Sequence, residues 1–359
     1  MTRFGACRPL LAAAFVFGVA AVGCDEGSGG PPTSPTAPAP VPVAPPPVRC
    51  AEEGRVLEFG FFAFSEPISY RGDPDPESPA FDEHRGYEAD LLSALEAMDG
   101  AGLSFNRRGI DVWPGIWLLP ATPEFDLVGG GITILEERTR DASGAPAVGF
   151  TSGHIGFRHS LLVRGADAAT LREYSGLTGE ARVGISAETT GESRFLRIVG
   201  LIDDGGVLLT GTSVTTPEGI VVADGTEAFR IAPGGASANL AGRSRLEPPS
   251  PGYPQVVFFG ADSPRSERLL ALATRGVDAL AGDEIGNRVA EAASDGFFVV
   301  TALDTEVELG GFALDQGEEV LLACLDDKLD YLTDERDIGY AEWLDNPSVF
   351  LERAEAWSP

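Results

Sequence analysis

Apolar positions along the chain follow two spacings, and these spacings predict strands and helices in alternation. Runs rich in aromatic and β-branched residues predict strands at 53–64, 103–113, 124–130, 160–165, 181–185, 255–260, 277–282 and 297–302. Apolar residues three or four positions apart predict helices at 86–100, 191–202, 263–276 and 318–332. Strands that alternate with helices are typical of parallel sheets with right-handed crossovers, so the pattern indicates an α/β fold with parallel-dominated sheets.

Local signals refine this pattern at two places. The helix at 263–276 has Ser263 as a candidate cap, Pro264 at its first position and Gly276 at its end. Residues 204–252 are rich in glycine, serine, threonine and proline and break the alternation. We interpret them as an insertion, in which the runs 207–211 and 220–225 could pair as a hairpin.

The N-terminal segment has the features of an export signal. Two arginines and no acid precede an apolar run that is too short to span a membrane comfortably. The run ends in AVGC, which resembles a bacterial lipobox and implies cleavage after residue 23 and lipid attachment at Cys24. An ordinary secretion signal followed by a spare cysteine is the alternative. We therefore expect a lipid-anchored protein on the periplasmic or cell-surface side of a bacterial membrane.

The segment at 24–49 is dominated by proline, alanine, serine and glycine. Proline-rich chain is extended and semi-rigid, so the segment is suited to be a tether, although a disordered tail without a spacing role has the same composition. About 310 residues follow from Cys50 onward, which is enough for two lobes.

Charge and cysteine content narrow the possible functions. The formal net charge of −29 argues against nucleic-acid binding, because phosphate neutralisation dominates that affinity. Export would remove Cys7 with the signal and lipidate Cys24. Cys50 and Cys324 would then remain in an oxidising compartment, where we expect them to form a disulfide; a buried free thiol at Cys324 is the alternative.

No metal, phosphate or nucleophile motif is evident. The three histidines, His84, His154 and His159, lack zinc-ligand spacing, and the acid-rich loop at 73–83 lacks the order of a calcium loop. The glycines at 129–131 match neither a phosphate loop nor a dinucleotide fingerprint, and no nucleophile elbow occurs. We expect no metal and no cofactor.

The stretch VGGGITILEER, at 128–138, suits a ligand clamp. Arg138 offers a fixed fork of donors for a carboxylate, Thr133 offers a hydroxyl, and the glycines up to Gly131 allow close backbone approach. A turn followed by a solvated helix start, with Arg138 paired to a nearby acid, accounts for the same residues equally well.

Six segments in order make the chain resemble a known family. They are GYEADLLSALEAM, WPGIWLLPATPEFDLVGGGITILEER, VGFTSGHIGFRHSLLVR, LTGEARVGISAETTGES, GVDALAGDEIGN and DERDIGYAEWLDNP. Together they resemble the type II periplasmic solute-binding proteins, in particular the polar-amino-acid group often called solute-binding family 3, over about 54–350 without the insertion. The resemblance implies two α/β lobes joined by two hinge strands, with the ligand between them. Lobe 1 would comprise 50–157 and the returning segment 303–359, and lobe 2 would comprise 158–302.

The resemblance also assigns roles to single residues. Arg138 would grip the ligand α-carboxylate with help from Thr133 and the backbone of Gly131, and Asp283 would take the α-ammonium. Thr189 and Thr190 would donate from lobe 2, and Trp113 with Phe64 or Phe62 would form an apolar wall. The chain departs from the family at Leu135, Glu188, Gly153 and His154, which bears on ligand identity more than on fold.

The expected function is therefore capture of an amino acid or similar small carboxylate by a monomeric lipoprotein that serves an ABC-type permease. A sensory lipoprotein without a transporter is an alternative. A dehydratase-like enzyme on the same scaffold is a weaker alternative, because Glu188 is its only candidate acid or base among the placed residues.

Overall fold

A computed structural model describes residues 49–261 and 263–358, all of which belong to one compact unit. The predicted signal at 1–23, the lipidation site at Cys24 and nearly all of the tether at 24–49 lie outside the described residues. In the part that is described, no helix is both long enough and apolar enough to cross a membrane.

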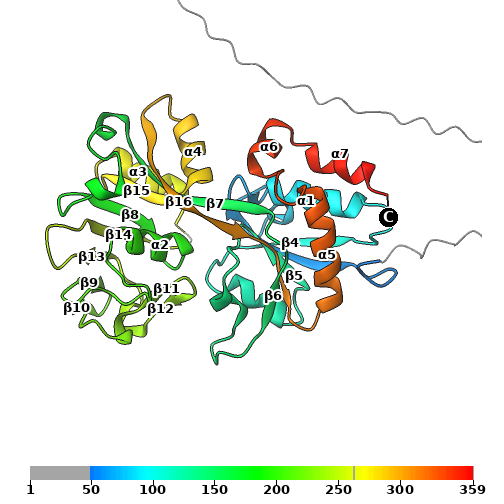
Figure 1. The fold of residues 1–359 in the computed structure, drawn as a ribbon, viewed down its shortest axis with the longest axis horizontal. Coiled ribbons are helices and arrows are strands. Elements are labelled where there is room, and N and C mark those ends of the chain that lie inside the picture. Colours follow the sequence, from blue (N-terminus) through cyan, green and yellow to red (C-terminus); the bar gives the residue numbers. More distant parts are fainter. Residues whose placement is uncertain (1–48, 262, 359) are drawn as a thin grey trace, which may run out of the picture. The chain divides into compact units, whose positions relative to one another are not determined.

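The first lobe is a five-stranded sheet covered by helices (Figure 1). Its strand order is β4 (Phe105–Ile110), β1 (Leu57–Phe62), β5 (Leu127–Gly129), β17 (Ala313–Asp315) and β6 (Val148–Phe150). Its helices are α1 (Tyr87–Ala97), α5 (Glu319–Leu332), α6 (Tyr340–Asp345) and α7 (Val349–Ala356). A small hairpin of β2 (Phe64–Ser65) and β3 (Ser69–Tyr70) follows β1.

The second lobe is an eight-stranded sheet with three helices around it (Figure 1). Its strand order is β10 (Gly219–Val222), β9 (Ser213–Thr216), β13 (Arg245–Glu247), β14 (Gln255–Phe259), β8 (Arg182–Ser186), β15 (Ala279–Asp283), β7 (Ile155–Arg164) and β16 (Phe298–Gly310). The helices are α2 (Thr190–Ile198), α3 (Arg265–Ala273) and α4 (Glu284–Ala292). A separate pair, β11 (Ile231–Ala232) and β12 (Gly235–Ala236), lies within the insertion.

Two long antiparallel strands connect the lobes. β7 begins five residues after β6, and β16 ends shortly before β17. The two strands pair along nearly their whole length, with register shifts near Val300 and Leu303 (Figure 1). The predicted lobe boundaries at 157/158 and 302/303 fall inside these strands.

The chain has the α/β two-lobe fold, but its sheets are more mixed than the sequence pattern predicts. Parallel pairs occupy one side of the first sheet, where β1 joins β4 and β5, and the middle of the second sheet, where β8 joins β14 and β15. The connecting strands, the return strand β17 and the inserted strands all add antiparallel pairs. A strand, a helix and the next strand form a parallel crossover only when both strands belong to the same sheet. The chain passes from one sheet to the other at the connecting strands and at the return strand, and their pairs are antiparallel.

Helix α1 illustrates how the pattern builds a core. Leu91, Leu92 and Leu95 fall on one face at helical spacing and are fully buried, while acids occupy the first turn. Helix α3 begins one residue later than predicted, because Pro264 and not Ser263 is its cap residue. In the insertion, the hairpin uses β9 rather than the predicted run 207–211.

Cys50 and Cys324 form a disulfide, with 5.3 Å between their Cα atoms. The bond joins the chain just before β1 to the middle of α5, 274 residues later. Both cysteines are buried in the core of the first lobe, so the predicted pair is present in the structure.

Candidate functional site

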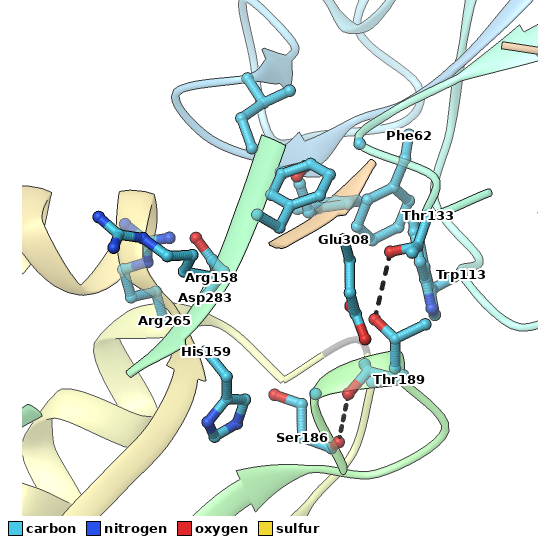
Figure 2. Close-up of a pocket in the computed structure, with 18 of the residues that line it drawn as sticks. Phe62, Trp113, Thr133, Arg158, His159, Ser186, Thr189, Arg265, Asp283 and Glu308 are labelled. Atoms are coloured by element: carbon cyan, nitrogen blue, oxygen red, sulfur yellow. Dashed lines mark hydrogen bonds between the residues drawn. The ribbon is translucent and has the colours of Figure 1, made fainter. Parts of the chain in front are cut away.

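One cavity of about 180 Å³ is lined by residues of both lobes and of the connecting strands (Figure 2). All predicted ligand-binding residues except Arg138 line it: Phe64, Trp113, Gly131, Thr133, Thr189, Thr190 and Asp283. The sequence reasoning missed Arg158, Arg265, Arg268 and Glu308, which line it as well. The cavity therefore combines an aromatic wall, hydroxyl groups and charges of both signs.

The two threonines of the second lobe are placed by the start of α2. Thr189 caps the helix, because its Oγ1 accepts from the Glu192 N–H at 3.2 Å and donates to the Ser186 carbonyl at 2.8 Å. The Oγ1 of Thr190 lies 3.3 Å from the Oγ1 of Thr133 of the first lobe. One hydroxyl contact thus links the two lobes at the cavity.

Glu188 stands where the family resemblance has a glycine, and its backbone conformation is one that suits glycine. Its φ is 62°, in the left-handed region that favours glycine. The Glu188 N–H donates to the Glu192 carboxylate at 2.7 Å, which holds the loop in place. The Glu188 side chain lines a neighbouring cavity with Trp113 and Arg243, and it does not line the central one.

The insertion helps to build this loop. Arg243 of the insertion donates to Glu192 through Nε at 2.6 Å and Nη2 at 2.5 Å, and both side chains are 1% exposed. Burial raises the pKa of Glu192, while Arg243 opposes that shift. A segment that breaks the sequence pattern therefore supports the loop that presents Thr189.

Arg138 is placed differently from the sequence prediction. It is fully buried and does not line the cavity. Nη1 donates to the Thr133 carbonyl at 3.2 Å, Nη2 donates to the Pro233 carbonyl at 3.4 Å, and the guanidinium lies 4.3 Å from the centre of the Trp117 ring. Burial lowers its pKa to about 10, and it forms no ion pair with a described residue.

The insertion is the reason that Arg138 does not line the cavity. Pro233 lies between β11 and β12, and its carbonyl occupies one face of the Arg138 fork. An ion pair of 3.2 Å between Arg230 and Glu137 fastens the same hairpin to the first lobe. The clamp prediction assumed open access to Arg138, which this contact removes.

The backbone of Gly131 is also engaged. Its N–H and that of Gly130 donate to the two carboxylate oxygens of the buried Glu88, at 2.9 and 2.7 Å. Gly131 has a φ of 75°, which explains a glycine there. The Gly131 N–H therefore already donates to Glu88. The resemblance had implied that this N–H would donate to the ligand, and the structure does not leave it available.

Asp283 ends β15 and caps α4, since its Oδ1 accepts from the Gly286 N–H at 2.6 Å. Figure 2 shows it beside Arg158 and Arg265, with Glu308 and Thr133 elsewhere around the cavity. Arg158 is paired with Glu284 at 3.1 Å. Burial raises the pKa of Glu308, although the charges of Arg194 and Arg138 oppose the shift.

His159 is buried and lines the cavity. Its Nδ1 lies 2.8 Å from the Tyr174 hydroxyl, and burial lowers its pKa to about 4, so the ring is neutral near pH 7. Among the described residues, no group of three or more histidines, cysteines or acids could hold a metal ion.

Comparisons with solved structures show the fold. A structure of an ancestral arginine-binding protein bound to arginine aligns with 17% identity and a TM-score of 0.50, covering 85% of this chain and 98% of that one. An ancestral amino-acid-binding protein, a precursor of cyclohexadienyl dehydratase, also aligns with 17% identity and a TM-score of 0.50, covering 84% and 95%. No protein-family model and no curated protein sequence matches the chain.

Proposed function

We propose that the protein captures a small carboxylate-bearing solute, such as an amino acid, between its two lobes. The observation that carries the proposal is the cavity itself, which residues of both lobes and both connecting strands line. Closing two lobes on a solute lets each lobe contribute contacts only in the closed form. The two-lobe fold shared with amino-acid-binding proteins supports the same conclusion.

The lining residues have the chemistry for such a solute. Arg265 and Arg268 offer donors for an acid group, and Glu308 offers an acceptor for an ammonium. Phe62 and Trp113, whose ring centres are 4.9 Å apart, give an apolar face. A buried charge needs a partner, and a zwitterion or acid supplies one.

We further propose that the chain is an exported, monomeric lipoprotein anchored at Cys24 and that it delivers its solute to an ABC-type permease. The signal-like N-terminus and the disulfide support export. The proposal is binding without catalysis: Glu188, the one catalytic candidate from the sequence, does not line the cavity, and Glu308, which does, is assigned to the ammonium of the solute. Mass measurement of the membrane-extracted protein tests the lipid, and permease genes beside its own would separate transport from a sensory role.

Thermal unfolding and calorimetry of the purified protein with a panel of amino acids and small carboxylates test solute capture. We expect at least one carboxylate ligand to raise the unfolding temperature and to bind with micromolar or tighter affinity. Thr190→Val should lower the affinity for that ligand, because the substitution removes a hydroxyl group at the cavity. Thr274→Val, on the exposed end of α3, is the matched control. If no carboxylate stabilises the protein, solute capture of this kind is refuted.

A further inference from the structure

Two arginines of α3 stand out at the cavity because, among the residues that the structure describes, neither has an acid within ion-pair distance. Arg265 and Arg268 lie three residues apart, and neither forms an ion pair with any residue that the structure describes. The chain has 55 acids against 26 lysines and arginines, and most of its described arginines do pair with an acid. The lack of partners here is therefore not a consequence of composition.

The contacts that these arginines do make leave donors available. Arg265 donates through Nη1 to the Gly286 carbonyl at 3.1 Å, and Arg268 donates through Nη1 to the Ser186 hydroxyl. Burial, followed by the like charge of Arg265, lowers the pKa of Arg268. Asp283 is the nearby acid, but one of its oxygens caps α4. Two partly buried like charges are costly unless an anion joins them.

Gly286 makes room for this arrangement. A Cβ atom at that position would lie 2.2 Å from Arg265 Nη2 and 3.1 Å from Asp283 Oδ2. The guanidinium therefore lies directly against the first turn of α4, in space that any other residue would fill. Glycine at position 286 thus lets Arg265 pack close to the start of α4 and donate to the Gly286 carbonyl.

We propose that Arg265 and Arg268 form a binding site for an acid group and that the solute is a small anion, such as a dicarboxylic amino acid, rather than a neutral or cationic one. This inference rests on the proposed solute capture and specifies its ligand. Arg158 is paired with Glu284, so the positive charge at the cavity that lacks a partner among the described residues comes from α3. An arginine fork binds a carboxylate or phosphate in a bidentate manner.

The matched pair of glutamate and glutamine tests the inference on the unaltered protein, because the two ligands differ only in one group, a charged carboxylate in one and a neutral carboxamide of the same shape in the other. Aspartate and asparagine form a second pair, and arginine is the cationic comparison. Calorimetry should show the acid binding roughly 10- to 100-fold more tightly than its amide, as expected for charge-assisted hydrogen bonds. O-phosphoserine against glutamate then tells whether the acid group is a phosphate or a carboxylate.

The variants Arg265→Gln and Arg268→Gln should each remove most of this preference, whereas Arg275→Gln changes the net charge equally and should leave it intact. Arg275 is exposed and lies beyond the end of α3. Arg268→Lys keeps the positive charge but not the bidentate guanidinium, so this variant should retain more of the preference for the acid over the amide than Arg268→Gln does. Thermal unfolding without ligand confirms that each variant is folded.

Three outcomes would overturn the proposal, and they distinguish its failure from the failure of solute capture. If an amide or a cationic amino acid binds at least as tightly as its acidic counterpart, the acid-group site is refuted while solute capture stands. The same holds if the α3 variants keep the full preference for the acid. If no small carboxylate binds at all, both proposals are refuted together.

Discussion

Replacing Arg243 with methionine tests whether the insertion is a structural support of the site. The Arg243 guanidinium and the Glu192 carboxylate are both 1% exposed and are joined by hydrogen bonds of 2.6 and 2.5 Å. Glu192 also accepts from the Glu188 N–H at 2.7 Å. Arg243→Met removes two of these three donors and leaves a buried carboxylate with one.

The expected loss of unfolding free energy follows from the two donors that Glu192 loses. Removing one partner of a buried ion pair costs about 3–5 kcal/mol, because the remaining charge is desolvated without compensation. The double variant Arg243→Met with Glu192→Leu should recover much of the loss, since apolar replacements of a buried pair are often neutral. The exposed pair of Arg140 and Glu136 is the control, because Arg140→Met should cost under about 0.5 kcal/mol.

Urea unfolding followed by tryptophan fluorescence measures these free energies, since the free energy of unfolding falls linearly with urea concentration. The pH dependence adds a second readout. Without Arg243, the pKa of Glu192 rises further, so protonation at lower pH neutralises the buried group. The deficit of Arg243→Met should therefore be smaller at pH 5 than at pH 8.

Solute binding gives the functional readout of the same variant. The Glu188 loop carries Thr189 to the cavity, so affinity should fall along with stability. A loss of unfolding free energy below about 1 kcal/mol for Arg243→Met would refute the reasoning, because a buried carboxylate without its ion-pair partner destabilises the folded state by more than that. An equal loss for Arg140→Met would refute it as well.

Two further predictions concern stability. Replacing Cys50 and Cys324 with serine, or reducing the bond, should lower the free energy of unfolding by about 2–5 kcal/mol, because the closed loop is long; unchanged thermal unfolding with a reductant would contradict this. Burial lowers the pKa of His159 from 6.5 to about 4, so the folded state binds fewer protons than the unfolded state between these values. Stability should therefore fall by about 3 kcal/mol as pH drops through this window. His159→Gln should flatten that slope of unfolding free energy against pH, and an unchanged slope would disprove the assignment.

Local pattern was enough for much of the fold. Helix α1 lies within the predicted segment 86–100, because its apolar stripe and its glycine stop are both local signals. The disulfide could be predicted by elimination, since export leaves Cys50 and Cys324 as the remaining pair. The boundary of α3 shifted by one residue, which is the usual uncertainty of a cap.

The site was less accessible to the sequence. Arg265 and Arg268 read as the solvated face of a helix, and Glu308 reads as the polar side of an alternating strand. Nothing in their local pattern distinguishes them from solvent-exposed charges. They matter because α3 and β16 lie at one cavity with residues more than a hundred positions earlier in the chain.

From the sequence alone follow the alternation of elements, the two-lobe fold class and the hydroxyl, aromatic and acidic residues that line the cavity. Which of these side chains are accessible to a solute depends on how distant segments pack together. The fork of Arg138 is covered by the carbonyl of Pro233, a residue 95 positions away in the insertion. Access to a side chain depends on what packs over it, and local periodicity carries no information about such distant contacts.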